Sequence, residues 1–235
     1  YMTDILIVAA TSKEAEFLLK GKQSPSMGKA LPLKGLSHAI RYDLLITGPG
    51  IHQTTWNMAK VLAGKSYDLA INIGIAGASD PNLKPVRVVQ VLSDCFADWG
   101  AEDSDGKILD SFQLGFIKPN EKPFKKGMLH ASFKKKLSCL AAIPSANGIT
   151  VNTATGTERR KQMLMEKYGE GIESMEGAAF FYACAMTKTP SLQIRSVSNM
   201  TGKRNRKAWK IKEAIDALNG FVGLLMMELE SKTKK

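Results

Sequence analysis

Short runs of apolar residues recur along the chain, and each has about the length of a β-strand. The run at residues 5–10 is apolar at every position, which is typical of a strand buried on both faces of a sheet. Other segments alternate between apolar and polar positions. The predicted strands are residues 5–10, 43–47, 67–73, 86–94, 148–153 and 192–199, with a possible hairpin within residues 107–116.

Helical patterns fill the intervals between these strands. The predicted helices are a short one that ends at residue 19, followed by residues 52–62, 131–142, 157–167, 176–186 and 209–229. Regular alternation of strands and helices is the pattern of an α/β fold. No segment resembles a linker between two cores, so we expect one domain that spans residues 1–235.

The segment at residues 173–186 is the most unusual in the chain. Its residues after Gly177 are apolar on all sides of a helical wheel, which predicts a helix in the protein interior. The first turn nevertheless carries Glu176, and a buried carboxylate is costly unless an arginine, hydroxyl groups or a ligand lies against it. The alternative is a simple helix-terminal glutamate, which the helix dipole favours by about 0.3–1 kcal/mol.

Polar and small residues follow several predicted strands, where ligands bind in α/β sheets. Glu14 follows the first strand, although it also fits an ordinary capping box. Ile75, Ala76 and Gly77 follow the strand at residues 67–73. These residues would let backbone N–H groups approach a ligand, or they form a tight turn without one.

Composition narrows the class of protein. A hydrophobic content of 44% and a charged content of 23% exclude disorder and collagen-like or coiled-coil designs. The formal charge of +11 allows anionic partners, but the lysines are scattered, so nucleic acid is only an alternative partner. The longest apolar run near the C-terminus, residues 221–227, is too short to cross a membrane.

Cysteine and histidine usage argues for a reducing compartment and against a metal. Three widely separated cysteines are expected to be free thiols, and the first residues do not resemble a signal peptide, so we expect a cytoplasmic protein. The histidines lack ligand-like spacing, and the Gly-Pro-Gly turn at residues 48–50 is no nucleotide fingerprint. We therefore expect no metal and no cofactor.

Three motifs occur in an order that resembles the purine nucleoside phosphorylase and nucleosidase superfamily. They are Met-Glu at residues 175–176, Asn-x-Gly-x-Ala-Gly at residues 72–77 and Val-Ser-Asn at residues 197–199. They are most similar to the methylthioadenosine/S-adenosylhomocysteine nucleosidases, and residues 195–206 with Trp209 resemble the futalosine hydrolase branch. The resemblance implies a three-layer α/β fold with a central twisted mixed sheet flanked by helices, a purine nucleoside substrate and a homodimer.

The resemblance also implies roles for the motif residues. Glu14 takes the place of the base that activates water, Glu176 that of the residue holding the ribose hydroxyls, and Met175 that of a residue packing on the sugar. The chemistry agrees, because cleavage of an N-glycosidic bond develops positive charge on the sugar, and the departing base must receive hydrogen bonds or a proton. Asn199 would serve that base.

This chain departs from the nucleosidase pattern at two positions. Asn199 replaces an aspartate, and its amide can donate to O6 and N7, the two acceptors of a 6-oxopurine such as hypoxanthine. Thr153 stands where the nucleosidases have a base-stacking aromatic residue. Arg204 and Arg206 follow Asn199, and either of them would bind a substrate carboxylate, unless surface ion pairs hold their loop.

Water is the expected nucleophile. Bacterial phosphorylases of this superfamily hold phosphate with an arginine and a serine, and the matching positions here are Asn72 and Ile75. The sequence therefore predicts a nucleosidase, most closely a futalosine hydrolase. The alternatives are a methylthioadenosine-type nucleosidase, a purine nucleoside phosphorylase, or a non-catalytic protein of the same fold that binds nucleotides or nucleic acid.

Overall fold

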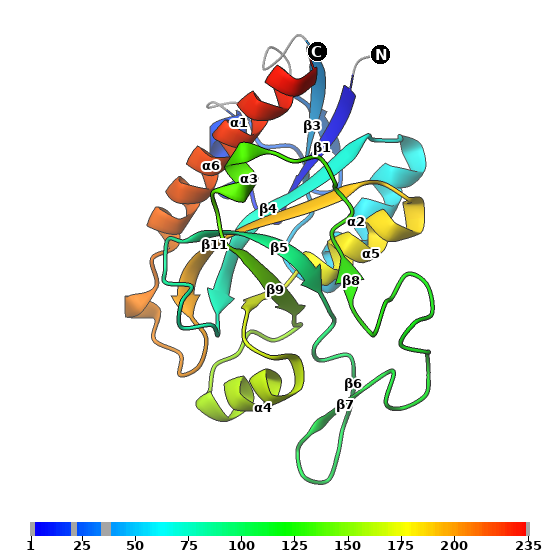
Figure 1. The fold of residues 1–235 in the computed structure, drawn as a ribbon, viewed down its shortest axis with the longest axis vertical. Helices are drawn as coiled ribbons and strands as arrows, with labels where there is room; N and C mark the ends of the chain where they lie inside the picture. Colours follow the sequence, from blue (N-terminus) through cyan, green and yellow to red (C-terminus); the bar gives the residue numbers. More distant parts are fainter. Residues whose placement is uncertain (1–2, 20–22, 34–38, 234–235) are drawn as a thin grey trace.

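The computed structural model describes residues 3–19, 23–33 and 39–233. A central sheet runs through the molecule, in the strand order β10-β9-β5-β11-β4-β1-β3-β2, with β8 paired to β5 (Figure 1). Its strands are β1 (Thr3–Ala9), β2 (Ala30–Pro32), β3 (Ile40–Ile46), β4 (Leu69–Ala78), β5 (Val88–Asp94), β8 (Leu129–His130), β9 (Ser145–Thr150), β10 (Ile172–Ser174) and β11 (Ser191–Met200). A separate hairpin joins β6 (Gly100–Glu102) to β7 (Ile108–Asp110).

The sheet is mixed. Strands β1, β3, β4 and β11 run parallel to their neighbours in the centre, whereas β5 is antiparallel to β11. The carboxyl ends of β1, β4 and β11 therefore meet at one edge of the sheet, where ligands bind in such folds.

Helices cover both faces of the sheet and form the outer layers. They are α1 (Glu16–Leu19), α2 (Ile51–Gly64), α3 (Ser138–Ala141), α4 (Glu158–Tyr168), α5 (Gly177–Thr187) and α6 (Ile211–Thr233). In β1, Ile5 and Ile7 face a core shared with α1, α3 and α6, whereas Leu6 and Val8 face a core shared with α2 and α5. Because successive strand residues point to opposite faces, an all-apolar strand supplies both cores. The predicted three-layer α/β fold with a mixed sheet is confirmed.

The central helix lies where the sequence predicts it, but its two ends differ. The first two turns of α5, from Gly177 to Cys184, are buried almost throughout, whereas Met186 is 58% exposed. The prediction that this helix lies in the protein interior is therefore correct for its first two turns, which follow Glu176, and wrong for its C-terminal end. Cys95 and Cys184 are buried free thiols, and Cys139 is half-buried.

One predicted helix is largely wrong. Only Ser138–Ala141 is helical within residues 131–142. The backbone N–H groups of Ser132 and Phe133 instead donate to the carbonyl of Ser191, and that of Ala131 donates to the carbonyl of Leu92. Contacts with distant strands thus override the local amphipathic pattern, which is a weak signal by itself.

Strand β4 is longer than predicted. The strand was predicted to end at residue 73, but residues 74–78 continue it because β11 pairs with them on one side and β10 pairs with residues 77–78 on the other. Residues 172–174, expected to lead directly into the helix, form β10. The hairpin occupies residues 100–110 rather than 107–116, and the first helix begins only at Glu16.

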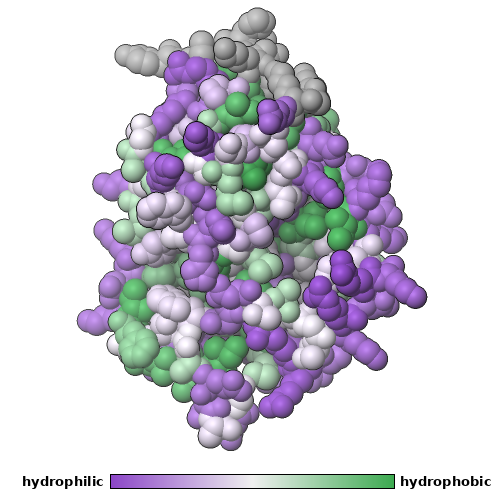
Figure 2. Space-filling model, turned by 180° about the vertical axis from the view of Figure 1, so that it is seen from behind, coloured by the Kyte–Doolittle hydropathy of each residue, from purple (hydrophilic) through white to green (hydrophobic). Residues whose placement is uncertain are grey.

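Hydrophilic side chains cover most of the face shown in Figure 2, and hydrophobic residues form separate patches between them. No helix among the described residues is long and apolar enough to cross a membrane. The apolar residues of the sequence are thus gathered mainly in the two cores.

Two adjacent leucines of α6 provide a test of this packing. Leu225 is completely buried in the core between α6 and the sheet, whereas Leu224 is 54% exposed. We expect Leu225→Ala to lower the free energy of unfolding by about 2–5 kcal/mol, because it leaves a cavity. Leu224→Ala is the matched control, with an expected change of about 0.5 kcal/mol or less. Urea unfolding followed by circular dichroism measures both, and equal losses would contradict this arrangement of α6.

Candidate active site

A cavity of about 300 Å³ opens at the carboxyl ends of β1, β4 and β11. Two cavities of about 420 and 400 Å³ lie elsewhere, but neither is lined by two carboxylates of the described residues. The sequence-predicted residues that line the cavity at the strand ends are Glu14, Ile75, Ala76, Gly77, Met175, Glu176, Asn199 and Arg204.

Glu14 lies in the turn between β1 and α1, and its side chain is buried. Its Oε1 accepts a hydrogen bond from the backbone N–H of Ile75 at 3.0 Å, and its Oε2 accepts from the backbone N–H and the hydroxyl of Thr11, both at 3.0 Å. Burial raises the pKa of the Glu14 carboxyl above its usual value, against the opposing effect of Arg195. A carboxylate with a raised pKa is a better base near neutral pH.

Glu176 lies between β10 and α5 and is also buried. Its Oε1 accepts a hydrogen bond from the backbone N–H of Gly50 at 2.9 Å. Gly50 has a φ of 91°, a conformation that glycine adopts without strain. The Gly-Pro-Gly turn, which carries no nucleotide fingerprint, therefore holds a carboxylate of the cavity in place.

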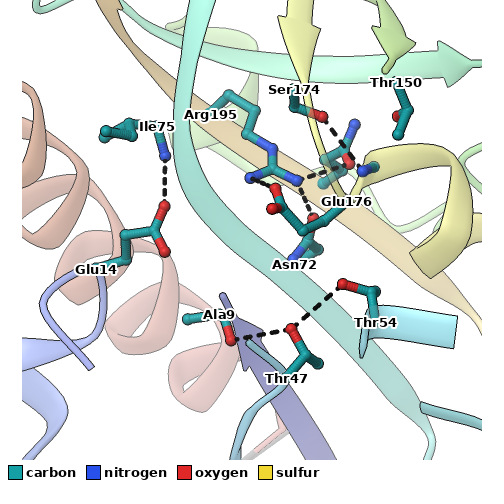
Figure 3. Close-up of polar contacts among 12 residues, drawn as sticks. Ala9, Glu14, Thr47, Thr54, Asn72, Ile75, Thr150, Ser174, Glu176 and Arg195 are labelled. Carbon is teal, nitrogen blue, oxygen red and sulfur yellow. Dashed lines mark hydrogen bonds and ion pairs between the residues drawn. The ribbon is translucent and has the colours of Figure 1, made fainter. Parts of the chain in front are cut away.

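Arg195 is the cation that lies close to both glutamates, and it was not identified from the sequence. It is completely buried within β11, and its Nη1 lies 3.6 Å from Oε2 of Glu176. Its Nη2 donates to Oδ1 of Asn72, and the guanidinium lies between Glu14 and Glu176 in Figure 3. A Cβ atom added to Gly74 would lie 2.2 Å from Nη1 of Arg195 and 2.9 Å from Oε1 of Glu14. Glycine at this position therefore lets the arginine and the glutamate approach each other.

A further buried acid, Asp94, is connected to Arg195 through Gln193. Asp94 accepts hydrogen bonds from Nε2 of Gln193 at 3.1 Å and from the hydroxyl of Thr150 at 2.8 Å. Oε1 of Gln193 lies 3.4 Å from Nη2 of Arg195. Burial raises the pKa of Asp94 to about 6, although its hydrogen bonds act in the opposite direction. A continuous polar network thus connects the cavity to the interior of the sheet.

Asn199 follows an irregularity of β11, where the pairing with β4 shifts between Val197 and Asn199. Its Nδ2 donates to the carbonyl of Met200 at 3.0 Å, and its Oδ1 accepts from the hydroxyl of Ser198 at 2.8 Å. A backbone carbonyl can only accept, so this contact fixes the amide nitrogen on its side. The second N–H of the amide has no partner among these contacts.

Two predicted residues lie outside the lining of the cavity. Thr153 is exposed, and its backbone N–H lies 3.4 Å from a carboxylate oxygen of Asp98. Arg206 is exposed at the start of a short 3₁₀ helix, η1 (Arg206–Ala208). Ala154 and Thr155 line the cavity close to Thr153 in the chain. The functional roles of all these residues remain predictions.

Sequence reasoning missed the importance of Arg195. The signal was a charged residue in the middle of the predicted strand at residues 192–199, where a buried arginine requires acceptors. The alternation of that strand did not show which acceptors those would be. In the described part of the chain, no group of three His, Cys, Asp or Glu side chains is placed to hold a metal ion, and His38 lies outside that part.

Comparison with known proteins gives consistent matches over most of the chain. The futalosine hydrolase of Streptomyces coelicolor is 31% identical over 236 residues, which cover 97% of each protein. The futalosine hydrolase of Thermus thermophilus is 27% identical over 224 residues, or 95% of each protein. A crystal structure of the 5'-methylthioadenosine/S-adenosylhomocysteine nucleosidase of Helicobacter pylori has a TM-score of 0.78 at 17% identity, with 97% of this chain and 99% of that chain covered.

The family profile of the phosphorylase superfamily matches residues 4–224. Apart from Thr3, the first residue of β1, this match covers the described strands of the sheet and every residue of the cavity described above. It confirms the family that the three motifs predict, and the chain belongs to the phosphorylase superfamily.

Proposed function

We propose that this protein hydrolyses the N-glycosidic bond of a 6-oxopurine nucleoside, and that its substrate is futalosine, which yields hypoxanthine and dehypoxanthine futalosine in menaquinone biosynthesis. The observation that carries the proposal is the pair of buried carboxylates, Glu14 and Glu176, which line one cavity beside the buried Arg195. The similarity over 97% of the chain to a futalosine hydrolase supports the choice of substrate.

The negative charge in the cavity suits the reaction. As the glycosidic bond breaks, the sugar acquires positive charge, and fixed anions near the ring stabilise it in a site of low dielectric. Glu176 would bind the sugar hydroxyls through its carboxylate, because Gly50 holds only one of its oxygens by a backbone hydrogen bond. Met175, which also lines the cavity, would pack against the sugar.

Glu14 would act as the base that takes a proton from water. Because burial raises its pKa above that of a free glutamate, its carboxylate is a stronger base near neutral pH. Ile75 and Thr11 fix both of its oxygens by hydrogen bonds, so the carboxylate is oriented before the substrate binds. Carboxylate oxygens have further lone pairs that can accept from a water molecule.

Arg195 would favour the ionised form of Glu14. The Glu176 charge raises the pKa of Glu14, and the Arg195 charge lowers it. Two neighbouring carboxylates without a cation would share a proton, which would remove the base. Arg195 would therefore act as a positioning residue that also sets the charge state.

The surroundings of β4 favour water over phosphate as the nucleophile. The sequence predicted no cation there, whereas the structure places the Arg195 guanidinium beside Gly74. That guanidinium is fully buried and already engaged by Asn72 and Glu176. A phosphate dianion would thus have to reach a buried guanidinium and lie beside the negative charge of Glu176, and the side chain of Ile75 offers it no hydrogen bond.

Substrate trials decide between this proposal and its alternatives. The purified protein is incubated with futalosine, inosine or methylthioadenosine, with and without phosphate, and the released base is separated by chromatography. We expect hypoxanthine from futalosine at a rate that is independent of phosphate. Release that requires phosphate would indicate a phosphorylase, faster release of adenine a methylthioadenosine-type nucleosidase, and no release from any substrate a binding protein.

We also propose that the protein forms a homodimer and is located in the cytoplasm. Trp99 is 41% exposed and packs against Phe96, Phe112 and Phe124 in an aromatic cluster, which is the kind of surface that partners cover. The three unpaired cysteines suit a reducing compartment. Light scattering of the purified protein would measure the mass of the assembly.

The first prediction concerns the base. Glu14→Gln should lower kcat/KM for futalosine by about 10²–10⁴-fold, the usual contribution of a positioned base. In the wild type, kcat/KM should fall as the pH drops through the pKa of Glu14, which lies above the 4.5 of free glutamate because burial raises it. Glu16→Gln, at an exposed glutamate on α1, is the control. A Glu14→Gln enzyme within a few-fold of wild type would remove Glu14 from the mechanism.

The second prediction concerns the buried cation. The Arg195 charge lowers the pKa of Glu14, so Arg195→Met should raise that pKa and move the acid limb of the kcat/KM profile to higher pH. Arg195→Lys keeps the charge and should move the limb less. Thermal melting accompanies both profiles, because removal of one partner from a buried ion pair costs about 3–5 kcal/mol of stability. An acid limb at the wild-type pH in folded Arg195→Met would refute this role.

The third prediction concerns the purine edge. The free N–H of Asn199 should favour a 6-oxopurine, since a 6-amino group would leave a buried donor unpaired at a cost of about 1–3 kcal/mol. That cost corresponds to about 5- to 150-fold in kcat/KM for futalosine over its 6-amino analogue. Asn199→Asp should reduce the ratio, because a protonated aspartate can donate to N7 and accept from the amino group.

Asn120→Asp is the control for the Asn199 variant, because Asn120 is exposed and its side-chain oxygen accepts from the backbone N–H of Lys126, away from the cavity. It should leave the ratio of the two substrates unchanged. If the wild type shows no preference, or if Asn199→Asp keeps the wild-type ratio, Asn199 does not read the purine edge.

A further inference from the structure

The cavity extends beyond the residues that the nucleoside itself requires. On the side of the loop after β11 and the start of α6, it is lined by Arg204, Trp209, Ile211 and Ile215, and Lys13 also lines it. Trp209 and Ile215 are half-buried, and Ile211 is 40% exposed. This region combines an apolar wall with two positive charges. A neutral ribose or purine does not need the positive charges.

Arg204 is held in an orientation that suits ligand binding. Its guanidinium carbon lies 5.0 Å from the centre of the Trp209 ring, and its backbone N–H donates to the carbonyl of Gly156 at 3.2 Å. Within the described residues, Arg204 takes part in none of the ion pairs. Stacking on an aromatic ring leaves the edge of a guanidinium free, and this edge binds a carboxylate through two parallel hydrogen bonds.

We propose that Arg204, Trp209 and Ile211 form a subsite for a substituent on the 5' side of the sugar that carries both an aromatic ring and a carboxylate. The apolar wall of Trp209, Ile211 and Ile215 would take the ring, and the edge of Arg204 would take the carboxylate. This inference rests on the proposed function, since the carboxyphenyl extension of futalosine is such a group. It makes Arg204 the residue that distinguishes futalosine from a simple nucleoside.

Arg204 and Arg206 differ in their position relative to the cavity. Both are exposed and lie in the same loop, but only Arg204 lines the cavity. Lys13, which follows β1, also lines the cavity. A lysine is a point charge that lacks the planar fork of an arginine. Lys13 would therefore add attraction for an anion without fixing the orientation of the carboxylate.

The test compares kcat/KM for futalosine and for inosine, which has the same base and sugar but no carboxyphenyl group. In Arg204→Ala the ratio of futalosine to inosine should fall by about 10- to 100-fold, the effect of losing hydrogen bonds to a charged group. Most of the change should appear in KM for futalosine. Arg204→Lys should fall between the wild type and Arg204→Ala, and thermal melting establishes that each variant is folded.

Two further variants control for charge and for position. Lys207→Ala removes an exposed charge from the same loop and should leave the ratio within two-fold of wild type. Arg206→Ala should change the ratio less than Arg204→Ala. The methyl ester of futalosine, which lacks the negative charge, should react with the wild type and with Arg204→Ala at similar kcat/KM.

The outcomes distinguish this inference from the proposed function. A wild type that cleaves inosine but not futalosine would refute the proposed substrate and the subsite together. A wild type that cleaves futalosine, with Arg204→Ala losing activity equally on both substrates or on neither, would refute the subsite alone. A larger fall of the ratio in Arg206→Ala than in Arg204→Ala would also overturn it.

Discussion

The charge of Arg195, buried completely in the middle of a sheet, is the constraint on which the site depends. An isolated charge in such a place would be unstable, so the surrounding strands must supply acceptors and opposite charge. Asn72 on β4, Gln193 on β11 and Glu176 before α5 do so. The guanidinium also explains why β4 carries Gly74, whose missing side chain leaves the space it occupies.

The sheet topology brings these groups together from distant parts of the sequence. Parallel strands β1, β4 and β11 end at one edge and deliver Glu14, the backbone of Ile75 and Asn199. Antiparallel β5 contributes differently, because Asp94 reaches Gln193 from behind the cavity. The mixed sheet therefore builds the site in two layers, with the proposed catalytic groups at its open edge and a supporting network inside it.

The sequence alone predicted the alternation of strands and helices, because buried strands and amphipathic helices have distinct periodicities. It also predicted Glu14, Glu176 and Asn199, which lie at strand or helix ends and line the cavity. It could not predict that residues 74–78 stay in β4, since their pairing with β10 and β11 is a long-range property. The partners of Arg195 were hidden for the same reason, because Asn72 is 123 positions away along the chain.

The hydrogen bond between Gly50 and Glu176 joins positions that are 126 residues apart. Glu14 and Ile75, 61 residues apart, are likewise joined by one backbone contact. Such distant contacts require the chain to close large loops, so the placement of both carboxylates depends on the packing of segments that lie far apart in the sequence. An assay of the proposed activity would therefore report on the native population of the protein.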